Sequence, residues 1–152
     1  QRVGIAQALL NDPELLIVDE PTAGLDPQAR VRFRNLLSDL AGERIVILST
    51  HIVTDVEAVA TDIALIENGC LVRHALPEEL LRAVEGNVWE VVVPSDELPG
   101  LKQRAIVSST ARRSDGVHAR VVSDRRPDNG AVPDEPTLED AYLSIIAGDG
   151  RA

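Results

Sequence analysis

Two adjacent carboxylates, Asp19 and Glu20, directly follow an apolar run, Leu-Leu-Ile-Val, at residues 15–18. The run predicts a short strand that is buried on both faces of a parallel sheet. Such strands end at the ligand crevice of the sheet, where two carboxylates are costly unless they serve a charge. We therefore expect Asp19 to hold Mg²⁺, directly or through water, and Glu20 to polarise a water molecule as a general base. The alternative is that both acids only cap the following turn.

A histidine, His51, follows a second apolar run, Ile-Val-Ile-Leu, at residues 45–48. If the two strands are neighbours joined by a right-handed crossover, His51 reaches the same crevice as the carboxylates. A neutral imidazole there could hydrogen-bond a terminal phosphate and orient the attacking water. Taken alone, a histidine at a strand end is more often an ordinary loop residue.

The loop Gly24-Leu25-Asp26-Pro27 lies between these two elements in the sequence. Asp26 suits the N-cap of a helix and Pro27 its first position, so the loop is expected to start a helix, with Gly42 as its C-cap. A functional interpretation adds that the loop is exposed beside the carboxylates, where it could touch a second subunit.

Taken in this order, residues 15–27 (Leu-Leu-Ile-Val-Asp-Glu-Pro-Thr-Ala-Gly-Leu-Asp-Pro) and 48–51 (Leu-Ser-Thr-His) resemble the C-terminal half of an ABC-transporter ATP-binding subunit. Gln1-Arg2-Val3 resembles the residues just after the signature motif of that family. The resemblance implies that Asp19 closes the Walker B strand as the magnesium-associated acid and that Glu20 is the catalytic base. It also implies that His51 is the switch histidine and that Leu25 and Asp26 belong to the D-loop. The D-loop departs from the commoner Ser-Ala-Leu-Asp form, because Ala23 and Gly24 precede Leu25. Any contact with a second subunit there must use backbone groups or Asp26.

The resemblance further implies a function: ATP hydrolysis, with ATP and Mg²⁺ as cofactors, coupled to transport across a membrane. The implied partners are a second ATP-binding subunit in a head-to-tail dimer and an integral membrane permease. The implied location is peripheral, on the cytoplasmic face of the cell membrane. Two alternatives stay open: a soluble ABC protein acting on ribosomes or DNA, and a non-catalytic binding module with vestigial motifs.

Several family motifs are expected upstream of Gln1: the Walker A loop, the Q-loop, the nucleotide-stacking aromatic and the signature motif. The sequence has no methionine, and its only lysine, Lys102, is not in a Gly-Lys-Ser/Thr loop. We therefore interpret the chain as a C-terminal piece of a longer protein. Alone, it is expected to bind nucleotide poorly and to hydrolyse none.

The expected fold class is α/β, because short apolar strands alternate with helices up to about residue 62. The resemblance assigns residues 1–85 to the C-terminal half of a P-loop NTPase sheet with flanking helices. A hairpin at 63–72, with Asn68-Gly69 as its turn, and a helix opened by Pro77 complete this part. A small α+β accessory domain is expected at 86–147, followed by a frayed tail at 148–152.

The accessory domain is expected to contain a strand at 89–93, a hairpin formed by 105–111 and 117–122, and a mobile loop at 123–136. A final helix is predicted to begin with a capping box formed by Thr137 and Asp140. Residues 89–93 (Trp-Glu-Val-Val-Val) and 136–142 (Pro-Thr-Leu-Glu-Asp-Ala-Tyr) resemble an accessory domain on ATPase subunits of drug-type and other ABC-2 exporters. The implied type of subunit is therefore the ABC-2 or drug-exporter type. The accessory domain would serve either as a packing module or as a regulatory or dimer-contact domain.

Composition excludes or disfavours several classes of function for this chain. The 152 residues carry a net charge of −10, which disfavours a nucleic-acid backbone or an anionic lipid surface as a direct partner. The single cysteine, Cys70, excludes an internal disulfide framework and a multi-cysteine zinc site. His74 and His118 lack partner ligands in the sequence, so we expect no metal site at either residue.

Overall fold

Contacts within the chain divide it into two units, Gln1–Thr61 and Asp62–Ala152, and each is described by itself. The computed structural model describes residues 2–149. The resemblance noted at Gln1 and the part of the predicted frayed tail at 150–152 therefore lie outside the described residues. Gly148 and Asp149, which were also predicted to fray, are the last two residues of helix α6 (Leu138–Asp149). The domain boundary expected near residue 85 concerns the extent of the family resemblance, and it stays a prediction.

The first unit alternates helices and strands, as its sequence pattern predicts. Strands β1 and β2 pair in parallel, with Leu15 opposite Ile45 and Asp19 opposite Ser49. Because the register has no offset, the carboxyl ends of both strands meet at one edge of this two-stranded sheet. The elements in order are α1 (Arg2–Leu9), β1 (Leu15–Asp19), α2 (Pro27–Ala41), β2 (Ile45–Ser49) and α3 (Val53–Val59).

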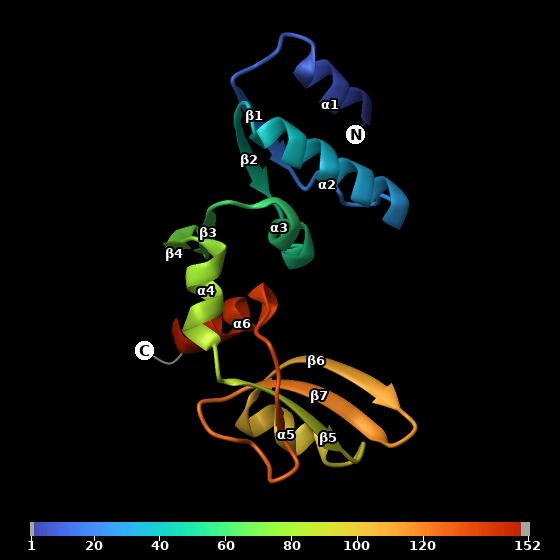
Figure 1. The fold of residues 1–152 in the computed structure, drawn as a ribbon, viewed down its shortest axis with the longest axis vertical. Helices are drawn as coiled ribbons and strands as arrows, with labels where there is room; N and C mark the ends of the chain where they lie inside the picture. The colour runs from blue at the N-terminus through green and yellow to red at the C-terminus, as the bar shows by residue number, and fades with distance from the viewer. Residues whose placement is uncertain (1, 150–152) are drawn as a thin grey trace. The chain divides into compact units, whose positions relative to one another are not determined.

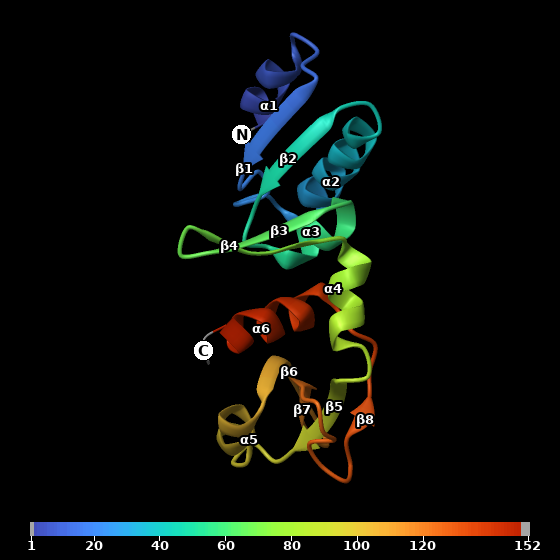
Figure 2. The same ribbon diagram turned by 90° about the vertical axis from the view of Figure 1, so that its left-hand side faces the viewer.

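Helix α2 begins where the sequence predicts. Asp26 is its N-cap and accepts a hydrogen bond from the Ala29 N–H at 2.9 Å, Pro27 occupies the first turn, and Gly42 is the C-cap. Figure 2 shows α2 lying along the two strands. Its apolar residues pack against one face of the sheet, forming a buried cluster of Leu16, Val18, Phe33 and Leu37.

The opposite face of the two strands is open, which corrects the expectation of a strand buried on both faces. Leu16 is 3% exposed, but its neighbour Ile17 is 65% exposed, and Ile45 on the paired strand is 66% exposed. Side chains alternate between the two faces of a strand, and among the described residues of this unit only one face is covered. An apolar run shows that both faces of a strand are suited to burial, but it does not show which other residues cover those faces.

The second unit begins with an antiparallel hairpin whose Asn68-Gly69 turn has φ of 50° and 77°, as the sequence predicts. A four-stranded antiparallel sheet follows, with strand order β6-β7-β5-β8, and α4 and α6 contact one another (Figure 1). The elements in order are β3 (Ile63–Glu67), β4 (Cys70–Ala75), α4 (Pro77–Val84), β5 (Val88–Val93), α5 (Leu98–Arg104), β6 (Ile106–Arg113), β7 (Gly116–Val122), β8 (Val132–Pro133) and α6 (Leu138–Asp149). The fold class is thus α/β in the first unit, followed by an α+β arrangement.

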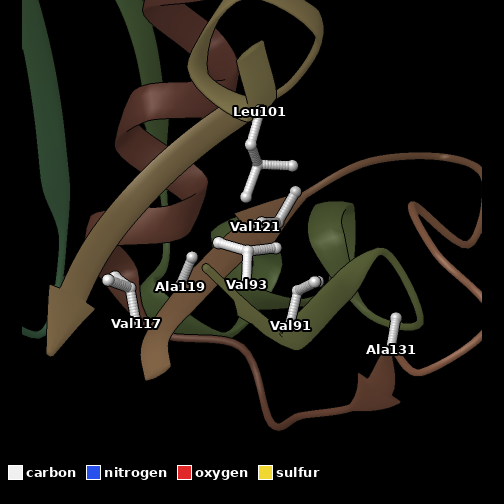
Figure 3. Packing of buried hydrophobic residues seen from close by; sticks show 7 residues of the cluster. All are labelled: Val91, Val93, Leu101, Val117, Ala119, Val121 and Ala131. Atoms are coloured by element: carbon white, nitrogen blue, oxygen red, sulfur yellow. The ribbon is translucent and has the colours of Figure 1, made fainter. Parts of the chain in front are cut away.

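The core of the second unit lies between α5 and one face of its sheet, as Figure 3 shows. Leu101 of α5 is fully buried against alternate residues of the central strands. Trp89 packs at the edge of this core and donates from its indole N–H to the Ser123 carbonyl at 3.0 Å. The buried cluster contains Val91, Val93, Leu101, Val117, Ala119, Val121 and Ala131.

The segment predicted as a mobile loop, 123–136, is tied to the sheet. Val132 and Pro133 form strand β8, which pairs with Glu90 and Trp89 of β5, and Ala131 is fully buried. Arg126 also donates two hydrogen bonds to the Ala131 carbonyl. The proline and glycine content indicates a loop, but it does not reveal one buried alanine and two pairing residues at a sheet edge.

The predicted capping box of α6 is confirmed: the Thr137 N–H donates to the Asp140 carboxylate at 2.9 Å, and the Asp140 N–H donates to the Thr137 hydroxyl at 3.4 Å. Asp140 is fully buried and also accepts from Ser108 and Arg120. Burial opposes its ionisation, but the hydrogen bonds from Ser108, Thr137 and Arg120 outweigh it and lower the pKa of Asp140. No helix within residues 2–149 has the length and apolar character needed to cross a bilayer.

Candidate active site

Glu20 is the first residue after β1, and its backbone is unusual. Its φ of 43° lies in the left-handed region, which a residue with a Cβ rarely adopts. Its N–H donates to the Ser49 carbonyl at 2.8 Å, so the backbone turns toward the end of β2. Strained backbone of this kind persists where its surroundings enforce it and clusters at functional sites. The turn directs the Glu20 side chain toward the residues that follow β2.

The Glu20 carboxylate binds the segment after β2 with both oxygens. Oε1 accepts from the His51 backbone N–H at 3.0 Å and lies 2.6 Å from His51 Nδ1, while Oε2 accepts from the Thr50 hydroxyl at 3.2 Å. The His51 contact is the main cause of a lowered pKa for Glu20. Because an ionised carboxylate only accepts hydrogen bonds, Nδ1 must carry the proton of this contact. Nε2 is then an acceptor in the neutral ring and a second donor in the imidazolium.

Asp19 is the last residue of β1, opposite Ser49, and its side chain is exposed. A carboxylate at this edge fits Mg²⁺ by its chemistry, because Mg²⁺ takes oxygen ligands and commonly uses one or two carboxylates with substrate phosphates and water. Within residues 2–149, no group of three or more His, Cys, Asp or Glu side chains is placed to hold a metal ion. A magnesium ion at this edge would take one of its oxygen ligands from Asp19.

Leu25 and Asp26 lie in the turn that leads into α2. Leu25 packs against the buried cluster of the first unit, and the Asp26 carboxylate binds the Ala29 N–H. Gly24, immediately before them, has a φ of 73°, which favours glycine at this position. The structure brings Glu20 and His51 together, but it does not bring Leu25 or Asp26 into hydrogen-bonding contact with that pair.

Three polar residues join the site that the sequence analysis did not single out. Thr50 holds Glu20 and also accepts from the Ile52 N–H at 3.1 Å. Thr22 and Asp55 are both buried and share a hydrogen bond of 2.5 Å. Thr50 could have been found from its place beside His51. Asp55 offered little signal, because one acid among the residues of a short helix usually faces solvent.

The other titratable residues considered in the sequence lie in the second unit. His74 Nε2 is 3.0 Å from Asp62, and Cys70 is exposed. His118 lies between two carboxylates: Nδ1 is 2.7 Å from Glu90 and Nε2 is 3.0 Å from Asp115. The hydrogen bonds to Glu90 and then to Asp115 raise the pKa of His118. Each of these two histidines is therefore paired with a carboxylate of the same unit.

Comparisons with known proteins show what the chain is similar to. A protein-family profile described as "AAA domain, putative AbiEii toxin, Type IV TA system" matches residues 1–54, the segment that contains Asp19, Glu20 and His51. The Nod factor export ATP-binding protein I of Paraburkholderia xenovorans is 34% identical over 95% of this chain and 51% of its own length. An uncharacterized ABC transporter ATP-binding protein of Synechocystis sp. is 32% identical over 99% of this chain and 45% of its own length.

A solved structure of a metal-chelate type ABC transporter in an inward-facing conformation aligns with 80% of this chain and 44% of its own, at 22% identity and a TM-score of 0.47. The chain spans about half the length of the curated relatives named above. Because homology to proteins of one kind extends over nearly the whole chain, the chain belongs to the family of ABC-transporter ATP-binding proteins.

Proposed function

We propose that this chain is the C-terminal part of the ATP-hydrolysing subunit of an ABC-2 type exporter and carries its catalytic base. The observation that carries the proposal is the contact between Glu20 and His51 at the carboxyl ends of two paired parallel strands. The exporter class is supported by relatives whose names contain Nod factor export. The runner-up activities, on ribosomes or DNA, have no comparable support here.

In the proposed reaction, the water oxygen bonds to the terminal phosphorus of ATP while the bond from that phosphorus to the leaving oxygen of ADP breaks, and Glu20 takes the proton that the water loses. His51 would donate to that phosphate from Nδ1 after leaving Glu20, or from Nε2 of the imidazolium, and Asp19 would hold the magnesium ion. When bound, Mg²⁺ neutralises charge on the phosphate oxygens. In the present structure both Glu20 oxygens accept hydrogen bonds, from Thr50 and His51. Each carboxylate oxygen has two lone pairs, so Oε2, which accepts only from the Thr50 hydroxyl, can still accept a proton from water.

The remaining parts of the machinery belong to the longer subunit that we propose. Its upstream half would supply the phosphate-binding loop and would cover the open face around Ile17 and Ile45. The segment with Leu25 and Asp26 would face a second ATP-binding subunit in a head-to-tail dimer. The subunit would bind a membrane permease from the cytoplasmic side, with 1–85 as the ATPase part and 86–147 as an accessory domain.

Glu20→Gln in the full-length subunit tests the proposal, because glutamine keeps the shape of the side chain and removes the base. We expect ATP binding to persist while steady-state hydrolysis falls by about 10²–10⁴-fold. Glu14→Gln is the matched control, since Glu14 is an exposed acid just before the other end of β1. Hydrolysis by Glu20→Gln at the rate of the control would contradict the role of Glu20.

His51→Ala tests the role of the histidine separately from that of Glu20. We expect hydrolysis to fall more than nucleotide affinity, because His51 would contact only the terminal phosphate and its water. Isothermal titration with ADP measures the affinity and a phosphate-release assay measures the turnover. If ADP affinity falls as far as turnover does, His51 has a structural role instead.

A further inference from the structure

Two segments carry the reacting groups of the proposed site: Glu20–Leu25 after β1, and Thr50–Ile52 between β2 and α3. Glu20 joins them at the surface, where its side chain is 34% exposed and that of His51 is 78% exposed. Ion pairs that are open to water contribute little to stability. The Glu20–His51 contact is therefore too weak to fix the relative position of the two segments by itself.

A second contact joins the same two segments below the surface. Thr22, two residues after Glu20, donates from its hydroxyl to Asp55 Oδ2 at 2.5 Å, and Asp55 lies in α3, four residues after His51. Thr22 is 2% exposed and Asp55 is 1% exposed. Water therefore does not compete for this hydrogen bond, and leaving either partner unpaired would be costly.

The environment of Asp55 is not one that stability alone favours. Its second oxygen, Oδ1, is buried and has no hydrogen-bond partner among the described residues. Its nearest cation is Arg34 of α2, with 3.8 Å between Nη1 and Oδ1, and that same nitrogen also donates to the Thr54 carbonyl at 3.4 Å. A buried carboxylate paired this loosely often contributes less stability than an apolar side chain of the same size. A role in holding the segments in register accounts for it better.

We propose that Asp55 is a positioning residue for Glu20 and His51, and that it acts through the Thr22 hydroxyl. This inference rests on the proposed ATPase function. Water competes for the exposed contact between the segments, so this contact does not hold the base and the histidine together at all times. The buried contact between Thr22 and Asp55 keeps the base and the histidine within reach of one water molecule while the exposed contact is open.

Thr22→Val in the full-length subunit removes the hydroxyl and keeps the branched shape of the side chain. We expect kcat for ATP to fall about ten- to a hundredfold, because small displacements of a catalytic group have effects of this size. The KM for ATP should change by less than about twofold, since the contact is not with the nucleotide. Thr22→Ser, which retains the hydroxyl, is the matched control and should restore most of the kcat.

Asp55→Asn gives an independent test, since it removes the charge of the acceptor and preserves its volume. In a double-mutant cycle, Thr22→Val and Asp55→Asn should be non-additive in kcat, because both act through one hydrogen bond. If the Thr22→Val protein does not fold, the inference is judged on Asp55→Asn by the same split between kcat and KM.

A purely structural role would lower the melting temperature of Thr22→Val and leave the kcat of the folded protein unchanged, and that result would overturn the inference. Additive effects of the two substitutions would also overturn it. Failure of the proposed function is distinguishable: Glu20→Gln would then hydrolyse ATP as fast as the wild type. Loss in Glu20→Gln combined with normal kcat in Thr22→Val and Asp55→Asn rejects only the role of Asp55.

Discussion

The two units of the chain differ in how completely they bury their own apolar residues. In the first unit, β1 and β2 bury one face under α2 and leave Ile17 and Ile45 largely exposed. In the second unit, the sheet closes over a core in which Val91 and Leu101 are almost completely buried. The residues proposed for catalysis all lie in the unit with the open face. The unit that carries the proposed catalytic residues is therefore not the unit that buries its own core more completely.

The largest expected effect is on hydrolysis by the chain alone. Residues 1–152 contain Asp19 and Glu20 but no Gly-Lys-Ser/Thr loop for the phosphates. Since catalysis of phosphoryl transfer depends mostly on positioning and charge stabilisation, we expect no measurable Mg²⁺-dependent hydrolysis of ATP. The measurement is phosphate release by the purified chain beside its Glu20→Gln variant. If the purified chain hydrolyses ATP and Glu20→Gln abolishes that hydrolysis, the first unit needs no further residues for catalysis. That result would contradict the comparison above.

The next effect concerns the buried polar cluster of the second unit. Asp140→Ala removes the carboxylate that binds Ser108, Arg120 and Thr137. Removing one partner of a buried ion pair costs about 3–5 kcal/mol, which should appear as a loss in the free energy of unfolding of this unit. Glu139→Ala, at an exposed neighbouring position, is the control and should cost no more than about 0.5 kcal/mol. Equal losses in the free energy of unfolding for the two variants would contradict the conclusion that the second unit has a tightly packed interior of its own.

A third pair of substitutions compares the two faces of β1. Leu16→Ala, at a residue 3% exposed, should destabilise the first unit by about 2–5 kcal/mol. Ile17→Ala, at a residue 65% exposed, should change the free energy of unfolding of the isolated chain by no more than about 0.5 kcal/mol. In the full-length subunit the cost of Ile17→Ala should rise toward that of Leu16→Ala. A neutral Ile17→Ala in both proteins would show that this face stays open.

The smallest effect is a pH dependence in the second unit. The folded pKa of His118 lies above its ordinary value of 6.5, because Glu90 and Asp115 accept from the ring. A raised folded pKa contributes stability that is complete below the unfolded pKa and is lost as the pH rises through the folded pKa. The second unit should therefore become less stable on the alkaline side of 6.5, and His118→Gln should flatten this slope. Denaturant titrations on both sides of that pH measure it, and an unchanged slope in His118→Gln would exclude His118 as its cause.

Much of the fold could be predicted from local signals. Asp26-Pro27 marks the start of α2, Asn68-Gly69 marks the first hairpin, and Thr137 with Asp140 marks the start of α6. Each is a short-range preference of the backbone, so it does not depend on residues far away in the sequence. The strand β8 was missed because its pairing with β5 is a long-range contact of only two residues.

The candidate site was predictable to the same extent. Asp19, Glu20 and His51 could be found because each follows an apolar run that predicts a buried strand. The proximity of Glu20 and His51 follows from parallel pairing without an offset. The partnership of Thr22 and Asp55 could not be predicted, because it depends on how α3 turns back toward the loop after β1. The exposure of Ile17 also depends on packing that an apolar run cannot specify.

The position of Trp89 makes unfolding of the second unit detectable by fluorescence. It is the only tryptophan, and its indole N–H is bonded to the Ser123 carbonyl beside the core of the second unit. Excitation of tryptophan fluorescence will therefore report the unfolding of the second unit, while the first unit, whose only aromatic residue is Phe33, contributes no signal of its own. A far-ultraviolet circular dichroism transition that does not coincide with the fluorescence transition would show directly that the two units unfold separately.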